Sequence, residues 1–182
     1  MSADNAADFP ALDVASRADY RVDCYVRSAV PGALAETISE IATYLQQLCE
    51  GGYLSDSRLL RWPRECQTAA ETEHGPTRHE LVAEFERWAD RHDCTLEPAF
   101  RREEIPPSPL SLGPDESRER IRVPIVALAL YEEDDETNGE TLREVVPRTK
   151  QSETGEERTD TVNDWLSAIE IRTRDEFAYT PV

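Results

Sequence analysis

Apolar and polar residues alternate along the chain in patterns that predict both strands and helices. From Tyr20 to Val26 apolar side chains occupy every second position, which is the period of a half-buried strand. A helix follows, because apolar residues then recur at spacings of three and four and form one stripe. The members of this stripe are Leu34, Ile38, Ile41, Leu45 and Leu48. Gly51 and Gly52 predict the end of this helix.

The middle of the chain predicts a short strand, a second helix and a further strand. Residues 57–62 form the short strand, which Pro63 ends. Thr77 and Glu80 match a capping box, so the second helix should begin there and end near His92. Its apolar face consists of Leu81, Phe85, Trp88 and Ala89. The next strand is indicated by Leu96, Ala99 and Phe100 and runs into Arg101 and Arg102.

The last part of the chain predicts a hairpin and a final helix. Several prolines make 105–117 a rigid surface loop. Residues 121–131 are the most apolar run and predict a strand, with Pro124 at an edge or bulge, and 142–146 return as its partner. Residues 150–160 are polar and are expected to be mobile. The final helix opens at Asp160 or Thr161 and buries Val162, Trp165, Leu166 and Ile169.

The predicted elements follow the order β-α-β-α-β-β-β-α, which favours the α+β class. The nearest named architecture is ferredoxin-like, with an antiparallel or mixed sheet and helices on one face. A winged helix, in which residues 121–146 form the wing, is the alternative. We expect a single domain over residues 19–170, a disordered acidic arm at 1–18 and a C-terminal tail at 171–182.

The excess of acidic residues indicates the salt concentration in which the protein works. The 182 residues include 20 basic and 38 acidic ones, so the formal net charge is −18, and Lys150 is the only lysine. An acidic, lysine-poor surface suits a cytoplasm of molar salt, where a Debye length of about 3 Å screens the self-repulsion. We interpret the acidity as halophilic adaptation. The alternative is an acidic surface that serves a basic partner.

No segment predicts export or a membrane span. The first residues lack the basic and apolar regions of a secretory signal, and no apolar run reaches the about 18 residues of a spanning helix. The cysteines are widely spaced, so we expect reduced and mostly buried thiols at Cys24, Cys49, Cys66 and Cys94. These features predict a cytoplasmic protein without a membrane partner.

The sequence also lacks the motifs of catalysis and of cofactor binding. His92 and Cys94 do not have the spacing of a zinc-ligand pair, and Pro76 lies between His74 and His79. Glycine-rich phosphate-binding loops are absent, and carboxylates are too numerous to indicate an acid–base pair. We therefore expect no enzyme activity, no catalytic residues, no metal site and no cofactor.

Clustered arginines are the best candidates for a contact surface. Arg61 and the neighbouring Trp62 would offer a nucleic acid both a positive charge and a stacking ring. The alternative is that the arginines pair with the surplus carboxylates. The candidate residues for contact with nucleic acid or a protein partner are Arg58, Arg61, Trp62, Arg101, Arg102, Arg120 and Arg122.

Several segments together carry a family resemblance: Tyr25-Val-Arg-Ser28, Phe85-Glu-Arg-Trp-Ala89, Leu96-Glu-Pro-Ala-Phe100 with Arg101 and Arg102, residues 123–131, residues 145–147, and the final Trp-Leu-x-x-Ile helix. They resemble a group of small haloarchaeal proteins labelled as carrying a helix-turn-helix domain found in halophiles. The resemblance covers roughly residues 19–170 and rests mainly on apolar core positions. It implies a DNA-binding or transcriptional role and carries over no catalytic or ligand residue.

The sequence therefore predicts a non-enzymatic, cytoplasmic binding or regulatory protein of a halophilic archaeon. The resemblance makes DNA-binding regulation of transcription the first hypothesis. The alternative is a protein–protein interaction module, or a homodimer, that does not bind DNA. The residue pattern itself separates the first two helices by a strand, and the second helix carries Glu84 and Asp90 on its outward face, where they would repel phosphates.

Overall fold

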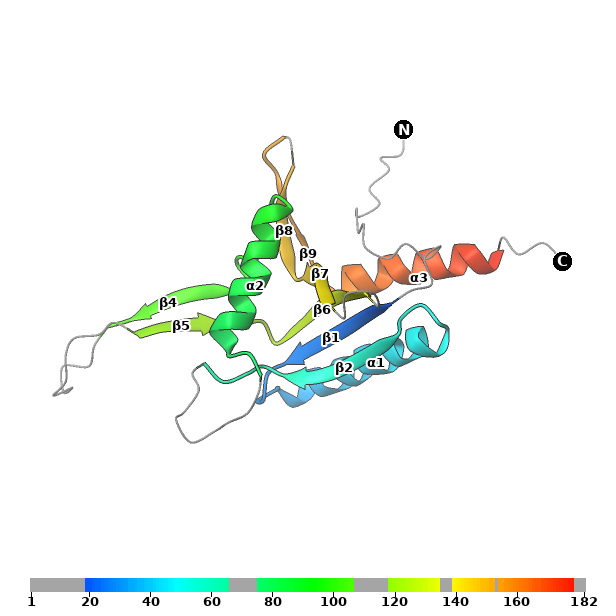
Figure 1. Ribbon diagram of the computed structural model, residues 1–182, viewed down its shortest axis with the longest axis horizontal. Coiled ribbons are helices and arrows are strands. Elements are labelled where there is room, and N and C mark those ends of the chain that lie inside the picture. The colour runs from blue at the N-terminus through cyan, green and yellow to red at the C-terminus, as the bar shows by residue number, and fades with distance from the viewer. Residues whose placement is uncertain (1–18, 66–74, 107–117, 135–138, 153, 179–182) are drawn as a thin grey trace.

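The computed structural model describes residues 19–65, 75–106, 118–134, 139–152 and 154–178 (Figure 1). A mixed four-stranded sheet with the order β2-β1-β6-β7 forms its centre. Its strands are β1 (Tyr20–Val26), β2 (Asp56–Arg61), β6 (Val126–Asp134) and β7 (Gly139–Val146). β1 and β2 are parallel, and the other two pairs are antiparallel. Parallel neighbours need a crossover, which α1 (Gly32–Glu50) supplies.

Helices cover both faces of this sheet, which corrects the prediction that they lie on one face. α1 and α3 (Val162–Ala178) pack against one face, where Val22 and Cys24 of β1 meet Leu45 and Trp165. α2 (Arg78–Arg91) packs on the other face, around Tyr25 of β1. All seven residues of β1 are buried, because each alternate set of side chains meets a different helical layer.

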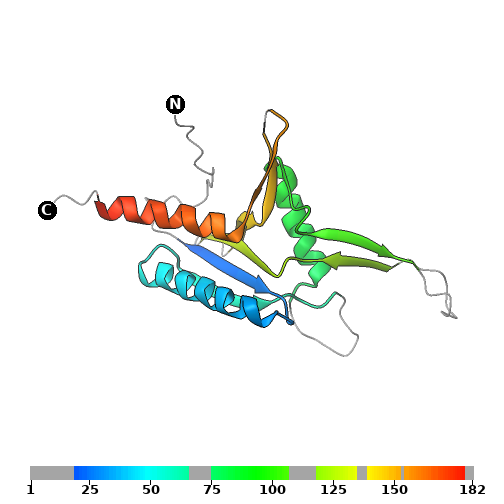
Figure 2. The ribbon, with the colours of Figure 1, turned by 180° about the vertical axis from the view of Figure 1, so that it is seen from behind.

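Two smaller strand groups flank the central sheet. β3 (Cys94–Thr95), β8 (Arg148–Gln151) and β9 (Glu157–Asp160) form a three-stranded sheet with the order β3-β8-β9. β4 (Arg101–Ile105) pairs with β5 (Arg118–Arg122) as a separate two-stranded antiparallel ribbon. Figures 1 and 2 show this ribbon projecting from the body beside α2.

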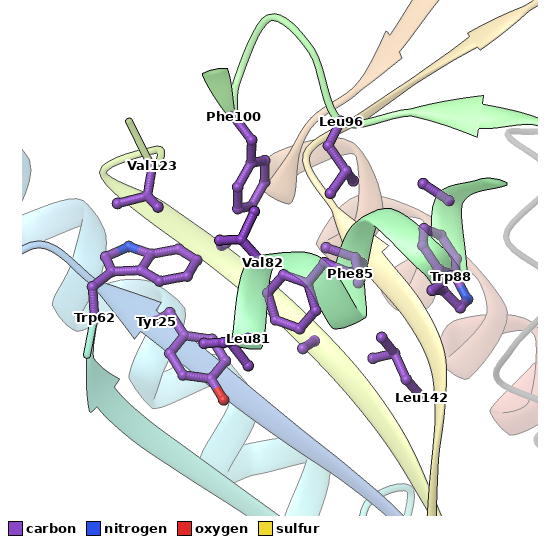
Figure 3. Packing of buried hydrophobic residues seen from close by; sticks show 14 of the residues in the cluster. Tyr25, Trp62, Leu81, Val82, Phe85, Trp88, Leu96, Phe100, Val123 and Leu142 are labelled. Atoms are coloured by element: carbon purple, nitrogen blue, oxygen red, sulfur yellow. The ribbon is translucent and has the colours of Figure 1, made fainter. Parts of the chain in front are cut away.

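An aromatic cluster joins the ribbon, α2 and the central sheet (Figure 3). The Trp62 ring stacks on Tyr25, with ring centroids 5.0 Å apart, and meets Phe100 edge-on at 5.7 Å. Phe85 of α2 also meets Phe100 edge-on, at 6.2 Å. Such edge-to-face pairs add to the free energy gained by burying aromatic area. The cluster therefore fixes the root of the ribbon relative to the sheet.

Three strand and loop predictions were wrong. The segment 96–100 is a turn rather than a strand, although its apolar Leu96 and Phe100 are buried against α2. The predicted strand 121–131 is two strands, because the chain breaks at 123–125 around Pro124, which has no N–H to donate. The segment 150–160 contributes to the β8–β9 hairpin instead of being a loop.

Other elements agree with their predicted bounds more closely. The capping box of Thr77 and Glu80 is present at the start of α2, and α3 begins directly after Thr161. α3 continues to Ala178, so the predicted tail is helical beyond Arg172. The α+β class is confirmed. The ferredoxin-like and winged-helix arrangements are not, since the sheet has a parallel β1–β2 pair and helices on both faces.

The predicted domain bounds stay a prediction. The arm at 1–18, the tip of the predicted proline-rich loop at 107–117, and the segment with Cys66 and His74 lie outside the described residues. Cys24 is buried, while Cys49 and Cys94 are partly exposed, and all three are free thiols.

Candidate nucleic-acid interface

The two faces of the β4–β5 ribbon differ in their surroundings. Residues directly opposite each other in an antiparallel pair point to the same side. Arg102 is opposite Ile121, which is buried in the α2 core, so this face looks toward the body. Arg101 is opposite Arg122 and Glu103 is opposite Arg120, and these residues form the other face. Arg101, Arg120 and Arg122 therefore share the ribbon face opposite to that of Ile121.

A cavity of about 550 Å³ is lined by residues of the ribbon, of the end of β1 and of the start of α2. The end of β1, the start of α2 and strand β5 each contribute arginine to its wall, and Glu103 is the one carboxylate among the residues that line it. We call this feature the arginine cavity and define it by Arg27, Arg78, Arg120 and Arg122. In a chain with a net charge of −18, four guanidinium groups against the two carboxylates of Glu103 and Glu65 form a local positive site.

Backbone contacts hold two of these arginines in place. Arg27 directly follows β1, and its Nε donates to the carbonyl oxygen of Val123 at 2.9 Å. Arg78 is the first residue of α2, and its Nε donates to the carbonyl oxygen of Pro63 at 3.0 Å. Nη2 of Arg27 donates to the same Val123 oxygen, and Nη1 of Arg78 donates to Oε1 of Glu65 at 3.2 Å. A guanidinium has five N–H donors, so each of these arginines keeps further N–H groups for other acceptors. These contacts make Arg27 and Arg78 the more rigid part of the arginine cavity.

The other two arginines are exposed and bound to carboxylates. The side chains of Arg120 and Arg122 are 59% and 61% exposed. Glu103 lies 3.3 Å from Arg122, and Glu65 lies 3.7 Å from Arg120 and 3.2 Å from Arg78. Exposed ion pairs contribute only about 0–1 kcal/mol each. A phosphate group can therefore replace these carboxylates at little cost in free energy.

Trp62 is placed differently from its predicted role as a stacking ring. It lines the arginine cavity, but it is only 5% exposed. Tyr25 covers one face of the indole, and Nε1 donates to the carbonyl oxygen of Pro124 at 3.1 Å (Figure 3). This conformation leaves no free ring face for a nucleic-acid base. Trp62 therefore acts as the floor of the cavity and as part of the aromatic cluster.

The remaining predicted arginines lie at different distances from the cavity. Arg61 borders it, because its Nη1 donates to the carbonyl oxygen of the cavity residue Ser28 at 3.3 Å. Arg101 shares the ribbon face of Arg122. Arg58 lies on β2, where it pairs with Asp56 at 2.9 Å.

Arg102 belongs to the opposite ribbon face and to a different contact. It bridges Glu86 of α2 at 2.6 Å and Glu119 of β5 at 2.9 Å. These carboxylates raise the pKa of the Arg102 guanidinium, with the hydrogen bond to Glu86 as the largest cause. This arginine fastens the ribbon to α2.

Sequence reasoning missed Arg27 and Arg78. Each stands alone in the sequence rather than in an arginine cluster, but each occupies an end of an element that was predicted correctly. Arg27 follows the strand of residues 20–26, and Arg78 follows the helix cap Thr77. Their positions at the ends of predicted elements are the signal that could have added these two arginines to the candidate contact residues.

Two further charge clusters are buried in the body. Arg21 contacts Asp23 at 3.2 Å, Glu133 at 3.1 Å and Glu140 at 2.8 Å, and its guanidinium lies over the Tyr131 ring. The hydrogen bond from Arg21 lowers the pKa of Glu140, whereas burial raises that of Asp23. The second cluster centres on Arg148. Both clusters join strands within the core and lie outside the set of residues that line the arginine cavity.

Two observations concern thiols and metal ligands in the described part of the chain. Burial raises the pKa of the Cys24 thiol to about 12, so this group stays protonated and unreactive near neutral pH. No group of three or more histidine, cysteine, aspartate or glutamate residues is arranged to hold a metal ion among the described residues.

Comparison with known families gives one match, which covers residues 14–174 and carries the description "helix-turn-helix domain". The chain belongs to this family. No significant match was found among curated proteins or among solved structures. Within the described residues, no helix is long and apolar enough to cross a membrane.

The helix-turn-helix family description does not correspond to a helix pair in the described residues. A helix-turn-helix motif joins two helices by a tight turn. Here β2 lies between α1 and α2, and these helices pack on opposite faces of the sheet. The outward side of α2 also includes the exposed carboxylates of Glu80 and Asp90. The arginine cavity is therefore the better candidate contact surface in this member of the family.

Proposed function

We propose that this protein is a DNA-binding transcriptional regulator that contacts the DNA backbone through the arginine cavity and the adjoining ribbon face. The observation that carries the proposal is the convergence of Arg27, Arg78, Arg120 and Arg122 from three elements of a strongly acidic chain. Membership of the helix-turn-helix family supports DNA as the partner. The protein acts by binding and not as an enzyme.

The chemistry of the cavity fits a phosphodiester. Guanidinium groups bind phosphate oxygens through two parallel hydrogen bonds, and such charge-assisted bonds are shorter and stronger than neutral ones. A two-stranded ribbon is also narrow enough to enter the major groove of DNA. With the ribbon in the groove, Arg120 and Arg122 exchange their carboxylate partners for phosphates. The acidic surface elsewhere on the protein repels DNA, which limits the orientations in which the protein can bind it.

The working environment follows from the charge. We propose that the protein operates in the cytoplasm of a halophilic archaeon, where salt screens its net charge of −18. High salt also weakens phosphate contacts, since log K falls by about 0.9 per contact for each tenfold rise in salt. Backbone contacts alone then leave little affinity, so base and shape readout by the ribbon must supply the rest.

The test is selection of DNA fragments by the purified full chain, followed by titration of the selected duplex at several salt concentrations. Replacing Arg120 and Arg122 together by alanine should weaken binding and reduce the salt slope by about 0.9 for each phosphate that the variant no longer neutralises. Arg143→Ala is the matched control, because its side chain is 50% exposed and pairs with Glu132 of β6. A chain that selects no DNA, or a double variant that binds like the control, would contradict the proposal.

A further inference from the structure

We infer that β2 is the surface through which a second copy of this chain joins, by antiparallel pairing of the two β2 strands about a twofold axis at Ser57. The inference concerns a face other than the arginine cavity and does not depend on DNA binding. It rests on three observations: an open strand edge, an exposed leucine beside a cavity, and a charge pattern that is complementary to itself.

The outer edge of β2 has no strand partner among the described residues. β2 ends the sheet order β2-β1-β6-β7 and lies beside β1 (Figure 1). The N–H of Trp62 donates inward to the carbonyl oxygen of Val26 at 3.1 Å. The N–H of Ser57 instead donates to its neighbour Asp56, at 2.9 Å from Oδ1. The N–H of Ser57 therefore points to the outer edge of the sheet, where the backbone of another strand can pair with it.

An exposed apolar side chain stands on the same strand. Leu59 is 57% exposed, more than any other large hydrophobic residue of the described chain. It pairs in register with Cys24, whose side chain belongs to the α1 and α3 core, so Leu59 points to the α1 side of the sheet. A cavity of about 390 Å³ lies on this side between α1 and β2. Its lining includes Leu45, Cys49 and Ser55.

Symmetry limits which residues can face each other. A twofold axis perpendicular to the sheet keeps the α1 sides of both copies together, so opposite residues must differ by an even number. An axis at Arg58 would place two arginines directly opposite and is unfavourable. An axis at Ser57 places Asp56 of each copy opposite Arg58 of the other. Their exposed intrachain pair, 2.9 Å apart, thus becomes two reciprocal pairs between the copies.

The same register brings the exposed Leu59 side chain to a cavity in which it can be buried. Leu59 of one copy comes level with Ser55 of the other. Ser55 precedes β2, donates its N–H to the carbonyl oxygen of Tyr20 in β1, and lines the cavity between α1 and β2. Twofold symmetry brings both leucines to the two equivalent cavities. Asp56 gives up its hydrogen bond from the Ser57 N–H and turns toward Arg58 of the other copy. Ser57 then forms backbone hydrogen bonds across the new pair of strands. Reciprocal charge pairs and burial of Leu59 thus favour this register, with a second copy as the occupant.

The experiment is sedimentation equilibrium of the full chain without DNA, at the lowest salt concentration that keeps it folded, because salt screens ion pairs. The wild-type chain should be a dimer. Leu59→Asp should raise the dimer dissociation constant about tenfold or more, which corresponds to about 1.4 kcal/mol. Ile105→Asp, on the ribbon, is the matched control: Ile105 is 43% exposed and lies outside β2. This control should remain dimeric.

A charge exchange tests the register. Asp56→Arg should weaken the dimer, and the double variant Asp56→Arg with Arg58→Asp should restore it, since the reciprocal pairs return with opposite sign. Circular dichroism checks that each variant is folded. A monomeric wild type would overturn the inference, as would a Leu59→Asp chain that dimerises like the wild type. A double variant that stays as weak as Asp56→Arg would overturn the register.

Discussion

Arg148 is a buried arginine that lies between two buried carboxylates. Its Nη2 is 2.8 Å from Oε1 of Glu144, without hydrogen-bond alignment, and its Nε is 3.3 Å from Asp160. Trp165 donates to the other Glu144 oxygen at 3.1 Å. Burial raises the pKa of Glu144, and the charge of Arg148 opposes this rise. Arg148 and Glu144 depend on each other, because each would be an uncompensated buried charge alone, whereas Asp160 also lies 3.3 Å from Arg158.

Arg148→Met should therefore lower the free energy of unfolding by about 3–5 kcal/mol, since it leaves Glu144 and Asp160 buried without their shared cation. Arg102→Met is the matched control, because Arg102 also bridges two carboxylates but has a 36% exposed side chain. It should cost about 0–1 kcal/mol. Urea denaturation measures both changes. Equal losses in the two variants would show that burial does not set the strength of these contacts.

A second prediction at the residue scale concerns Glu103, which neutralises Arg122 at the arginine cavity. Glu103→Gln should tighten DNA binding about two- to fivefold, because it removes a competing carboxylate worth up to about 1 kcal/mol. Glu119→Gln is the control, since Glu119 pairs with Arg102 of the other ribbon face. Titration of a selected duplex compares the variants. Unchanged or weaker binding of Glu103→Gln would argue against Glu103 as a competitor for phosphate.

At the scale of elements, two helices begin with the same device. Oε2 of Glu80 accepts from the Thr77 N–H at 2.7 Å, and Oδ2 of Asp164 accepts from the Thr161 N–H at 2.8 Å. These bonds satisfy backbone donors that precede the first helical turn. The backbone hydrogen bond from Thr77 lowers the pKa of Glu80, and the Thr161 hydroxyl does the same for Asp164. Both caps consequently require an ionised carboxylate.

The caps predict a defined pH dependence. A lowered carboxylate pKa in the folded state means that its contribution to stability is present above the ordinary value of 4.5 for glutamate. It is lost as the pH falls through the lowered folded value. The difference in unfolding free energy between wild type and Glu80→Ala should thus be constant at neutral pH and shrink in acid. Urea denaturation across this range measures it. A difference that grows toward acid would contradict the cap.

The whole molecule carries a net charge of −18, which opposes its compact state at low salt. The clusters around Arg21 and Arg148 balance some carboxylates locally, but among the described acidic residues only Asp23, Glu144 and Asp160 are buried. Self-repulsion between exposed charges is long-range, and only dissolved ions reduce it. Stability at this scale therefore depends on the solvent more than on any single contact.

Stability should accordingly rise with potassium chloride and level off near 1 M, where the Debye length falls to about 3 Å. Urea titration at each salt concentration measures the change, because urea is uncharged and leaves ionic strength unaltered. A chain whose unfolding free energy does not respond to salt would contradict the proposed halophilic adaptation.

Local patterns in the sequence determined the elements whose signals are contained in a few neighbouring residues. Apolar spacing predicted β1 and α1, Thr77 predicted where α2 begins, and the prediction of Asp160 or Thr161 placed the start of α3 within one residue. These signals work because helix periods and caps are set by bonds between residues three or four apart. The same reasoning found the arginine clusters but could not tell which arginines meet.

Tertiary structure alone decided how these elements are placed. Arg27 contacts Val123 although they are 96 positions apart, so no local pattern could bring β1 and β5 together around one cavity. The strands β8 and β9 are polar, and their pairing brings Asp160 opposite the buried Arg148. Trp62 became a core residue because the stacked Tyr25 covers it. Packing and charge pairing between residues far apart in the chain determined these placements. Neither produces a periodic pattern in the sequence that could be recognised beforehand.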